Sequence, residues 1–238
     1  MLRRFHLKLV LYVLSAICSI VILLTLGVSY IQAVYLTTPV RNQNIGIPVG
    51  LSYQDITLTT ADGLKISGWY IAGTRPDAIV LVHGIHANRT YLLPQARLLS
   101  EAGYHVLLID LRGHGNSEGN LMTYGYSEAL DVAATIDYAL VLPEVEQIAV
   151  VGHSLGAAAA VRAAATDDRV KAIVIQSSYS SLSQAIDDSF EVFSIFPKWP
   201  FAPLIVSLAE LRTGFEIGQV SSCYDLATML PPPGFHYS

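Results

Sequence analysis

The body of the chain carries two kinds of apolar pattern. Residues 55–60 and 65–71 alternate polar and apolar side chains around Asp62-Gly63, which predicts a β-hairpin with a tight turn. Continuous apolar runs predict four buried strands, at residues 78–82, 105–110, 147–151 and 170–175. Helical spacing of apolar residues predicts three helices between them, at residues 90–102, 127–140 and 155–166. Apolar strands that alternate with helices indicate an α/β fold, with a mostly parallel sheet covered by helices on both faces.

The first 36 residues follow neither pattern. The run from Leu9 to Tyr30 has no charge, and as a helix it would span roughly 33 Å, enough to cross the hydrocarbon core of a bilayer. Arg3, Arg4 and Lys8 precede it, so the positive-inside rule places the N-terminus in the cytoplasm and the rest outside. We therefore expect a single-pass transmembrane anchor. A cleaved signal peptide is the alternative, but this run is longer than the usual h-region and no clean Ala-Xaa-Ala site follows.

Irregular segments divide the rest of the chain. Residues 37–50 contain Pro, Gly and Asn without periodicity, and predict a linker that leads from the membrane to a domain at residues 51–216. Residues 178–205 combine aromatic side chains with three prolines, which predicts an irregular, cap-like apolar segment over a site. The end of the chain, residues 217–238, contains three consecutive prolines and predicts an irregular tail.

Composition narrows the classes of function. Of the 238 residues, 52% are apolar and 14% charged, against about 25% charged in ordinary soluble domains, which excludes disorder. The net charge is −5, and the part beyond residue 38 carries 11 basic and 19 acidic residues, or −8. An acidic body repels phosphate backbones, so we expect no nucleic-acid partner. Cys18 and Cys223 do not suggest a disulfide framework, and no spacing of His, Cys or Gly predicts a metal or cofactor site.

One motif carries chemistry. The pentapeptide GHSLG at residues 152–156 lies between a predicted strand and an Ala-rich predicted helix, the context of a nucleophile elbow. The chain must turn sharply there, and glycines at both ends leave room for neighbouring backbone. This arrangement holds the hydroxyl of Ser154 above the carboxyl edge of the sheet, at a helix N-terminus that favours developing negative charge.

Two further motifs precede GHSLG in the chain. His83-Gly84 ends the third predicted strand, and DLRGHGNS at residues 110–117 follows the fourth. Over roughly residues 52–216 the chain resembles the α/β-hydrolase superfamily. It is similar to the branch that contains monoacylglycerol lipases, prolyl aminopeptidase-type serine aminopeptidases and related lipid esterases.

The resemblance assigns roles to individual residues. It implies that Ser154 is the nucleophile and that the backbone N–H groups of Leu155 and Ile85 form the oxyanion hole. It also implies that His83 shapes the oxyanion loop by hydrogen bonding, and that His114 belongs to a structural loop near the site.

The sequence lacks clear candidates for the acid and the histidine that would complete a catalytic triad with Ser154. The family supplies an acid after the seventh strand and a histidine after the eighth, but no strand pattern follows the predicted strand at 170–175. Asp225 and His236 are the acid and histidine that remain, and no sheet strands position them. We therefore expect a hydrolase fold that is incomplete after the sixth strand and truncated at its C-terminus, with that strand as an exposed apolar edge.

The functional expectation is a membrane-anchored serine hydrolase that cleaves a small-molecule ester or amide through an acyl-enzyme on Ser154. The apolar segment and the anchor favour a lipid-like acyl ester. A catalytically inactive chain that acts as a binding module stays open as the alternative. The sequence does not name the oligomeric state or the extracytoplasmic compartment.

Overall fold

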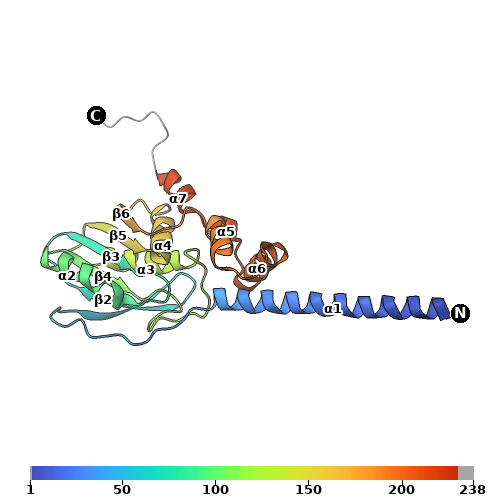
Figure 1. Cartoon of the computed structure of the whole chain (residues 1–238). Helices are drawn as coiled ribbons and strands as arrows, with labels where there is room; N and C mark the ends of the chain where they lie inside the picture. The colour runs from blue at the N-terminus through green and yellow to red at the C-terminus, as the bar shows by residue number, and fades with distance from the viewer. Residues whose placement is uncertain (1, 230–238) are drawn as a thin grey trace, which may run out of the picture. The chain divides into compact units, whose positions relative to one another are not determined.

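The structure is a computed structural model, and it describes residues 2–229 (Figure 1). The chain forms two compact units. Among the described residues, one contains the N-terminal segment up to Thr37 together with Asp187–Gly214, and the other contains Thr38–Ile186 and Phe215–Met229. The second is called the globular unit below.

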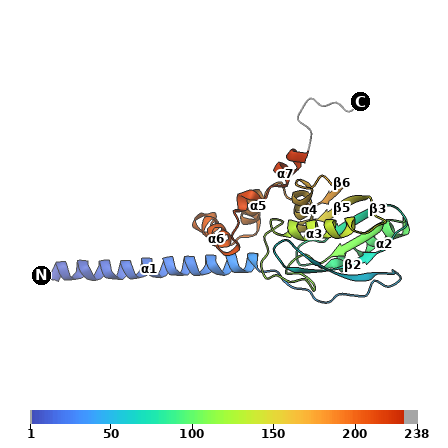
Figure 2. The same cartoon turned by 180° about the vertical axis from the view of Figure 1, so that it is seen from behind.

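The globular unit is built on one six-stranded sheet (Figures 1 and 2). Its strands are β1 (Gln54–Thr59), β2 (Lys65–Ile71), β3 (Asp77–Val82), β4 (His105–Ile109), β5 (Gln147–His153) and β6 (Val170–Gln176). They lie in the order β1-β2-β4-β3-β5-β6. β2 pairs antiparallel with β1 and β4, whereas the strands from β4 across to β6 are parallel to their neighbours. The predicted hairpin and mostly parallel sheet are confirmed.

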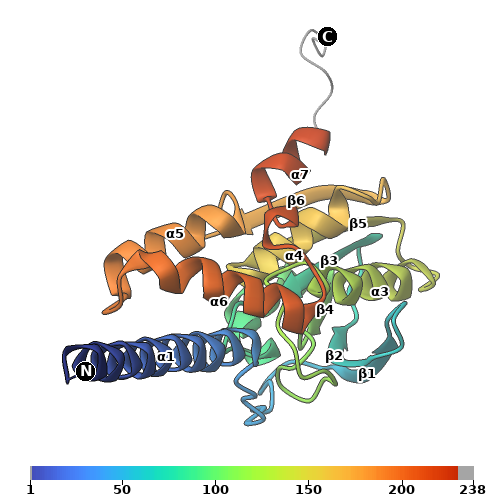
Figure 3. The same ribbon diagram turned by 90° about the vertical axis from the view of Figure 1, so that its right-hand side faces the viewer.

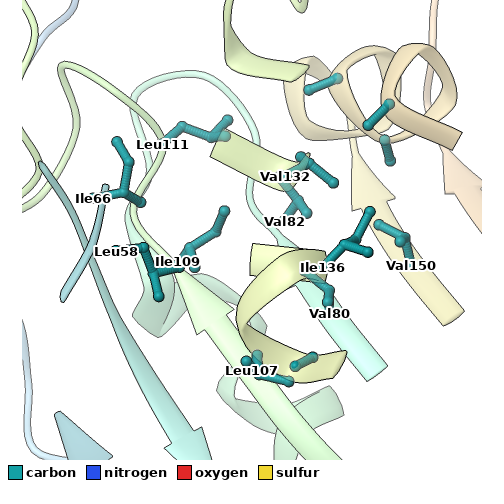
Figure 4. Close-up of a cluster of buried hydrophobic side chains, with 14 of the residues drawn as sticks. Leu58, Ile66, Val80, Val82, Leu107, Ile109, Leu111, Val132, Ile136 and Val150 are labelled. Atoms are coloured by element: carbon teal, nitrogen blue, oxygen red, sulfur yellow. The ribbon is translucent and has the colours of Figure 1, made fainter. Parts of the chain in front are cut away.

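Apolar cores cover both faces of this sheet. On one face, alternate residues of the central strands such as Val80 and Ile109 pack with Val132 and Ile136 of α3 (Glu128–Leu140) and with α4 (Leu155–Ala164) (Figure 4). On the other face, the intervening residues of β3 and β4 pack with Leu92 and Ala96. These two belong to a 3₁₀ turn, η1 (Arg89–Leu92), and to α2 (Leu93–Glu101). Continuous apolar strands are therefore explained by burial on both sides.

The expected exposed edge is present. Within residues 2–229, β6 pairs with β5 alone, and its outer side bears no further strand. Val174 is 57% exposed and Ile175 is 38% exposed. Within the described residues the sheet therefore ends on an apolar strand.

The segment from Thr38 to Tyr53 contains no helix or strand, but hydrogen bonds hold it to the rest of the globular unit. Arg41 donates hydrogen bonds to the carbonyl oxygens of Ser117 (2.5 Å) and Gly119 (2.7 Å). Asn88 donates from Nδ2 to the carbonyl oxygen of Asn42 at 3.1 Å. The predicted linker over residues 37–50 is therefore irregular in conformation and bound along the globular unit.

Two helices replace the irregular segment predicted over residues 178–205. They are α5 (Leu182–Phe193) and α6 (Lys198–Thr213). The prediction was wrong because the prolines of α6 lie where they do not disrupt a helix. Trp199 has non-helical angles (φ −102°, ψ 131°), so the regular part of α6 begins at Pro200. Pro200 and Pro203 then fall among the first four residues, whose N–H groups have no acceptor within a helix.

The irregular tail predicted over residues 217–238 is also wrong where the structure describes it. A 3₁₀ turn, η2 (Ile217–Gln219), leads into α7 (Ser222–Met229). The Ser221 hydroxyl accepts a hydrogen bond from the Tyr224 N–H at 3.2 Å and so caps the helix start. The three consecutive prolines lie outside the described residues.

The other unit is dominated by α1 (Leu2–Thr37), a single continuous helix that contains the predicted anchor. Residues 5–24 are exposed along its entire circumference, and no charged residue occurs between Lys8 and Arg41. The helix is long and apolar enough to cross a membrane, and a signal sequence would pass the same test.

Candidate active site

Ser154 occupies the predicted strand-to-helix turn. It follows β5 directly and precedes α4, with backbone angles φ 52° and ψ −115°. Non-glycine residues rarely adopt positive φ, and such strain collects at functional sites. A Cβ at Gly152 would overlap the backbone of Gly156 and Ala157, and one at Gly156 would overlap the carbonyl oxygens of Val82 and His83. Both glycines of the motif are therefore required by the close approach of backbone.

His83 fixes the loop that follows β3. Its ring is fully buried, its Nδ1 lies 2.7 Å from the Gly84 carbonyl oxygen, and its Nε2 accepts the Leu111 N–H at 3.1 Å. Since Nε2 accepts, Nδ1 carries the proton and donates to the carbonyl. Burial lowers the pKa of His83 to about 4, which keeps the ring neutral. The expectation that His83 shapes this loop by hydrogen bonding agrees with these contacts.

The same loop lies against Ser154. A Cβ built on Gly84 would stand 2.8 Å from Nδ1 of His153 and 3.2 Å from the Cβ of Ser154. Ile85 follows in this loop, and Leu155 is the first residue of α4. Neither the Ile85 N–H nor the Leu155 N–H has a hydrogen-bond acceptor among residues 2–229. Two unpaired backbone donors therefore flank the serine, as an oxyanion hole requires.

The loop after β4 is braced by two buried ion pairs. Asp110 accepts hydrogen bonds from the Arg89 N–H (2.7 Å), from Arg89 Nη2 (2.8 Å) and from the Asn116 N–H (2.9 Å). Arg112 donates to Asp131 from Nε (2.9 Å) and Nη2 (2.8 Å). Burial raises the pKa of the Asp131 carboxyl, and the hydrogen bonds from Arg112 oppose that rise. Sequence reasoning missed Arg89 and Asp131, because no local motif marks a partner that lies 19 to 21 residues away.

His114 belongs to the same loop and packs its ring at 5.3 Å, edge to face, on that of His83. Its Nδ1 lies 2.9 Å from the Arg112 carbonyl oxygen, while its buried Nε2 has no partner among residues 2–229. Burial lowers the pKa of this ring as well. The structural position expected for His114 agrees with these contacts.

The remaining parts of a triad are not assembled in the described part of the chain. Asp225 lies in α7, with its carboxylate 3.9 Å from Nη1 of Arg162. Arg162 stands eight residues after Ser154 on α4, about 12 Å along the helix axis. His236 lies outside the described residues. Ser154 Oγ makes no hydrogen bond to any histidine or carboxylate of residues 2–229.

No metal site emerges either. Within residues 2–229, no group of three His, Cys, Asp or Glu side chains is placed to bind an ion. The site consists of a strained serine, a helix N-terminus and two backbone donors without acceptors among residues 2–229. Chemically, such a site can bind a carbonyl group and stabilise the negative charge that forms when a nucleophile attacks it.

The comparisons with known proteins agree with this geometry. The family model described as alpha/beta hydrolase fold matches residues 77–202. An esterase of Pyrococcus furiosus, Pf2001, superposes with a TM-score of 0.62 at 29% identity, over 72% of this chain and 68% of that one. This chain is therefore similar in fold to an esterase of known structure.

Curated sequences add two relatives. The uncharacterized protein Rv2307c of Mycobacterium tuberculosis is 31% identical over 151 residues, 61% of this chain and 52% of its own length. The uncharacterized protein YqkD of Bacillus subtilis is 25% identical over 170 residues, 69% of this chain and 55% of its own. The chain thus spans about half the length of the curated relatives that it matches. Since the family model covers more than half of the chain and the elbow geometry agrees with it, the protein belongs to the α/β-hydrolase family.

Proposed function

We propose that the protein is a membrane-anchored serine hydrolase that cleaves a small-molecule ester or amide through an acyl-enzyme on Ser154. The observation that carries the proposal is the positive φ of Ser154 at the end of β5, next to the loop of Gly84 and Ile85. The kinship with an esterase favours an ester over an amide. The finer resemblance to lipases and serine aminopeptidases leaves the leaving group open.

The chemistry follows from the site. Ser154 Oγ attacks the carbonyl carbon, and the carbonyl oxygen becomes an anion that accepts hydrogen bonds from the N–H groups of Ile85 and Leu155. Each such donor is worth roughly 3–4 kcal/mol in comparable sites. The tetrahedral intermediate expels the leaving group, and water then hydrolyses the acyl-serine. Loss of the hydroxyl proton requires a general base, and no histidine or carboxylate of residues 2–229 lies within hydrogen-bond distance of Oγ.

We also propose that α1 holds the protein in a membrane as a single-pass anchor, with the N-terminus cytoplasmic and the hydrolase unit outside. The support is the uncharged run between Lys8 and Arg41, the exposure of residues 5–24 and the basic residues that precede them. An anchored enzyme meets substrates that partition into lipid, which favours an acyl ester. Alkaline carbonate extraction of membranes that contain the full chain tests the anchor, since a cleaved signal sequence would leave the protein in the soluble fraction.

A fluorophosphonate probe tests the nucleophile. The full chain in detergent should be labelled, and Ser154→Ala should abolish labelling. Ser177→Ala is the matched control, because Ser177 also has positive φ (59°), follows β6 and is exposed. The proposal fails if folded protein is not labelled, or if Ser177→Ala removes the label and Ser154→Ala does not.

The alternative is a catalytically inactive binding module. One observation favours it: no imidazole reaches Ser154 Oγ within the described residues. Loss of the histidine alone costs on the order of 10⁶ in kcat where a triad acts as a unit. Hydrolysis of a p-nitrophenyl ester by the full chain, compared with Ser154→Ala, separates the two functions. Equal background rates in both would support the binding module.

A further inference from the structure

Helix α1 does not stand alone in its unit. Helix α6 lies beside its C-terminal part (Figure 3). The two run in the same direction, because Arg212, near the end of α6, donates from Nε to Oγ1 of Thr37, the last residue of α1, at 2.9 Å. One turn earlier in both helices, Ala33 shares a buried cluster with Ile205 and Ala209.

The contact is close because the facing side chains are small. Ser29, Ala33 and Thr37 recur every four residues on α1, and each is at least 97% buried. Small residues at this spacing let helix backbones approach, as they do between membrane helices. Residues 5–24 of α1 are exposed, so α6 covers the last third of the helix.

The parallel register sets the depth of the α5–α6 turn. Pro200, the first regular residue of α6, precedes Arg212 by twelve residues and therefore lies beside about residue 25 of α1. Residue 25 falls inside the uncharged run from Leu9 to Tyr30. If α1 crosses a bilayer with that run, the turn between α5 and α6 reaches the lipid.

The composition of this turn fits lipid. Between Glu191 and Glu210 the chain has a single charged residue, Lys198. Val192 is 71% exposed, Ile195 is 90% exposed and Trp199 is 79% exposed, an unusual display of apolar surface. The three define what we call the apolar tip.

The lysine of this turn pairs with an acidic residue earlier in α5. Lys198 extends its ammonium back to Asp187, with Nζ 3.0 Å from Oδ1. Asp187 lies two turns before the end of α5, and the acidic residues of α5 all precede Val192. A lysine that reaches away from an apolar surface toward a polar layer, next to an exposed tryptophan, is the pattern of a membrane–water interface.

From these observations we infer that the α5–α6 hairpin is a second membrane contact, with the apolar tip inserted into the outer leaflet beside α1. This inference rests on the proposed anchoring of α1. The partner is the bilayer itself, and the polar residues of α5 stay in the headgroup layer.

Tryptophan fluorescence tests the inference on the full chain. The protein has two tryptophans, Trp199 in the apolar tip and Trp69, which is 3% exposed in the globular unit. The full chain is reconstituted in phosphatidylcholine vesicles with and without bromine on the acyl chains. Wild-type emission should fall by up to half in brominated lipid, and the Trp199→Phe variant should lose little.

A labelled cysteine separates this inference from the anchoring. In a Cys18→Ser, Cys223→Ser background, an environment-sensitive dye at Val13→Cys reports α1, and the same dye at Val141→Cys reports an exposed apolar site of the globular unit. Quenching at position 13 without quenching of Trp199 overturns the inference and leaves the anchor intact. No quenching at position 13 overturns the anchor itself. The inference is also overturned if brominated lipid quenches the dye at position 141 by the same fraction as it quenches Trp199. Lipid contact would then not be specific to the apolar tip.

Discussion

At the residue scale, the elbow depends on backbone that has no room for a side chain. Gly156→Ala should destabilise the protein by about 1–3 kcal/mol, because its Cβ would press on the carbonyl oxygens of Val82 and His83. Gly218→Ala is the matched control, since a Cβ there meets no atom within 4 Å, and it should change stability by less than about 0.5 kcal/mol. Thermal unfolding of both variants checks this, and equal melting temperatures would contradict it.

The neutral His83 predicts a pH dependence. Burial lowers its folded-state pKa to about 4, below the ordinary value of 6.5, so the unfolded chain binds more protons between those values. Stability from this residue is therefore present above pH 6.5 and lost as pH falls toward 4, by about 3 kcal/mol in all. We expect the free energy of unfolding, measured with denaturant between pH 7 and pH 4, to fall less steeply with decreasing pH for His83→Gln than for wild type. Identical slopes would show that His83 contributes nothing to the pH dependence.

At the element scale, the buried ion pair between Arg112 and Asp131 ties the loop after β4 to α3. Asp131→Ala should cost about 3–5 kcal/mol, because it leaves a buried guanidinium short of a partner. Asp137→Ala is the control on the same helix, where the pair with Arg169 is half exposed and worth at most about 1 kcal/mol. The ratio of the two losses in urea unfolding is the measurement, and comparable losses would argue against a buried brace.

Elements could be predicted from the sequence where their pattern reflects burial. The strands fall within two residues of the predicted bounds, because both faces of the sheet select apolar side chains. The start of α3 shows the limit: Ser127 suits an N-cap, but its side chain makes no capping bond. Instead Glu128 is buried and accepts the N–H groups of Thr123 and Gly125, both at 2.8 Å. The buried Glu128 carboxylate therefore fixes the turn before α3 without a capping bond from Ser127.

At the scale of the whole molecule, the family, the sheet and the position of Ser154 could be predicted from three motifs in order. The helices α5 and α6 could not, because the prolines and aromatic side chains of residues 178–205 suggest an irregular segment and the packing of α6 on α1 is not visible in the sequence. The same limit applies to Asp225. A sequence shows that an acid follows the elbow, but not that Arg162 engages its carboxylate at 3.9 Å.

The apolar edge predicts a property of the whole molecule in solution. Val174→Lys places a charge on the open side of β6 and should reduce self-association, with little cost in stability because the side chain is 57% exposed. Val141→Lys changes a valine that is 76% exposed and lies away from the edge, and it should leave association unchanged. Light scattering of the full chain in detergent at matched concentrations measures both. Equal scattering by wild type and Val174→Lys would show that β6 is not the associating surface.

The two unpaired donors beside Ser154 belong to the main chain. Any amino acid except proline at positions 85 and 155 presents the same N–H dipole, so alanine scanning would pass over both positions. A main-chain ester in place of either amide would delete the donor and leave every side chain in place. The part of the site that would stabilise the oxyanion is therefore set by the conformation of the backbone. The side chains at positions 85 and 155 can vary with the substrate.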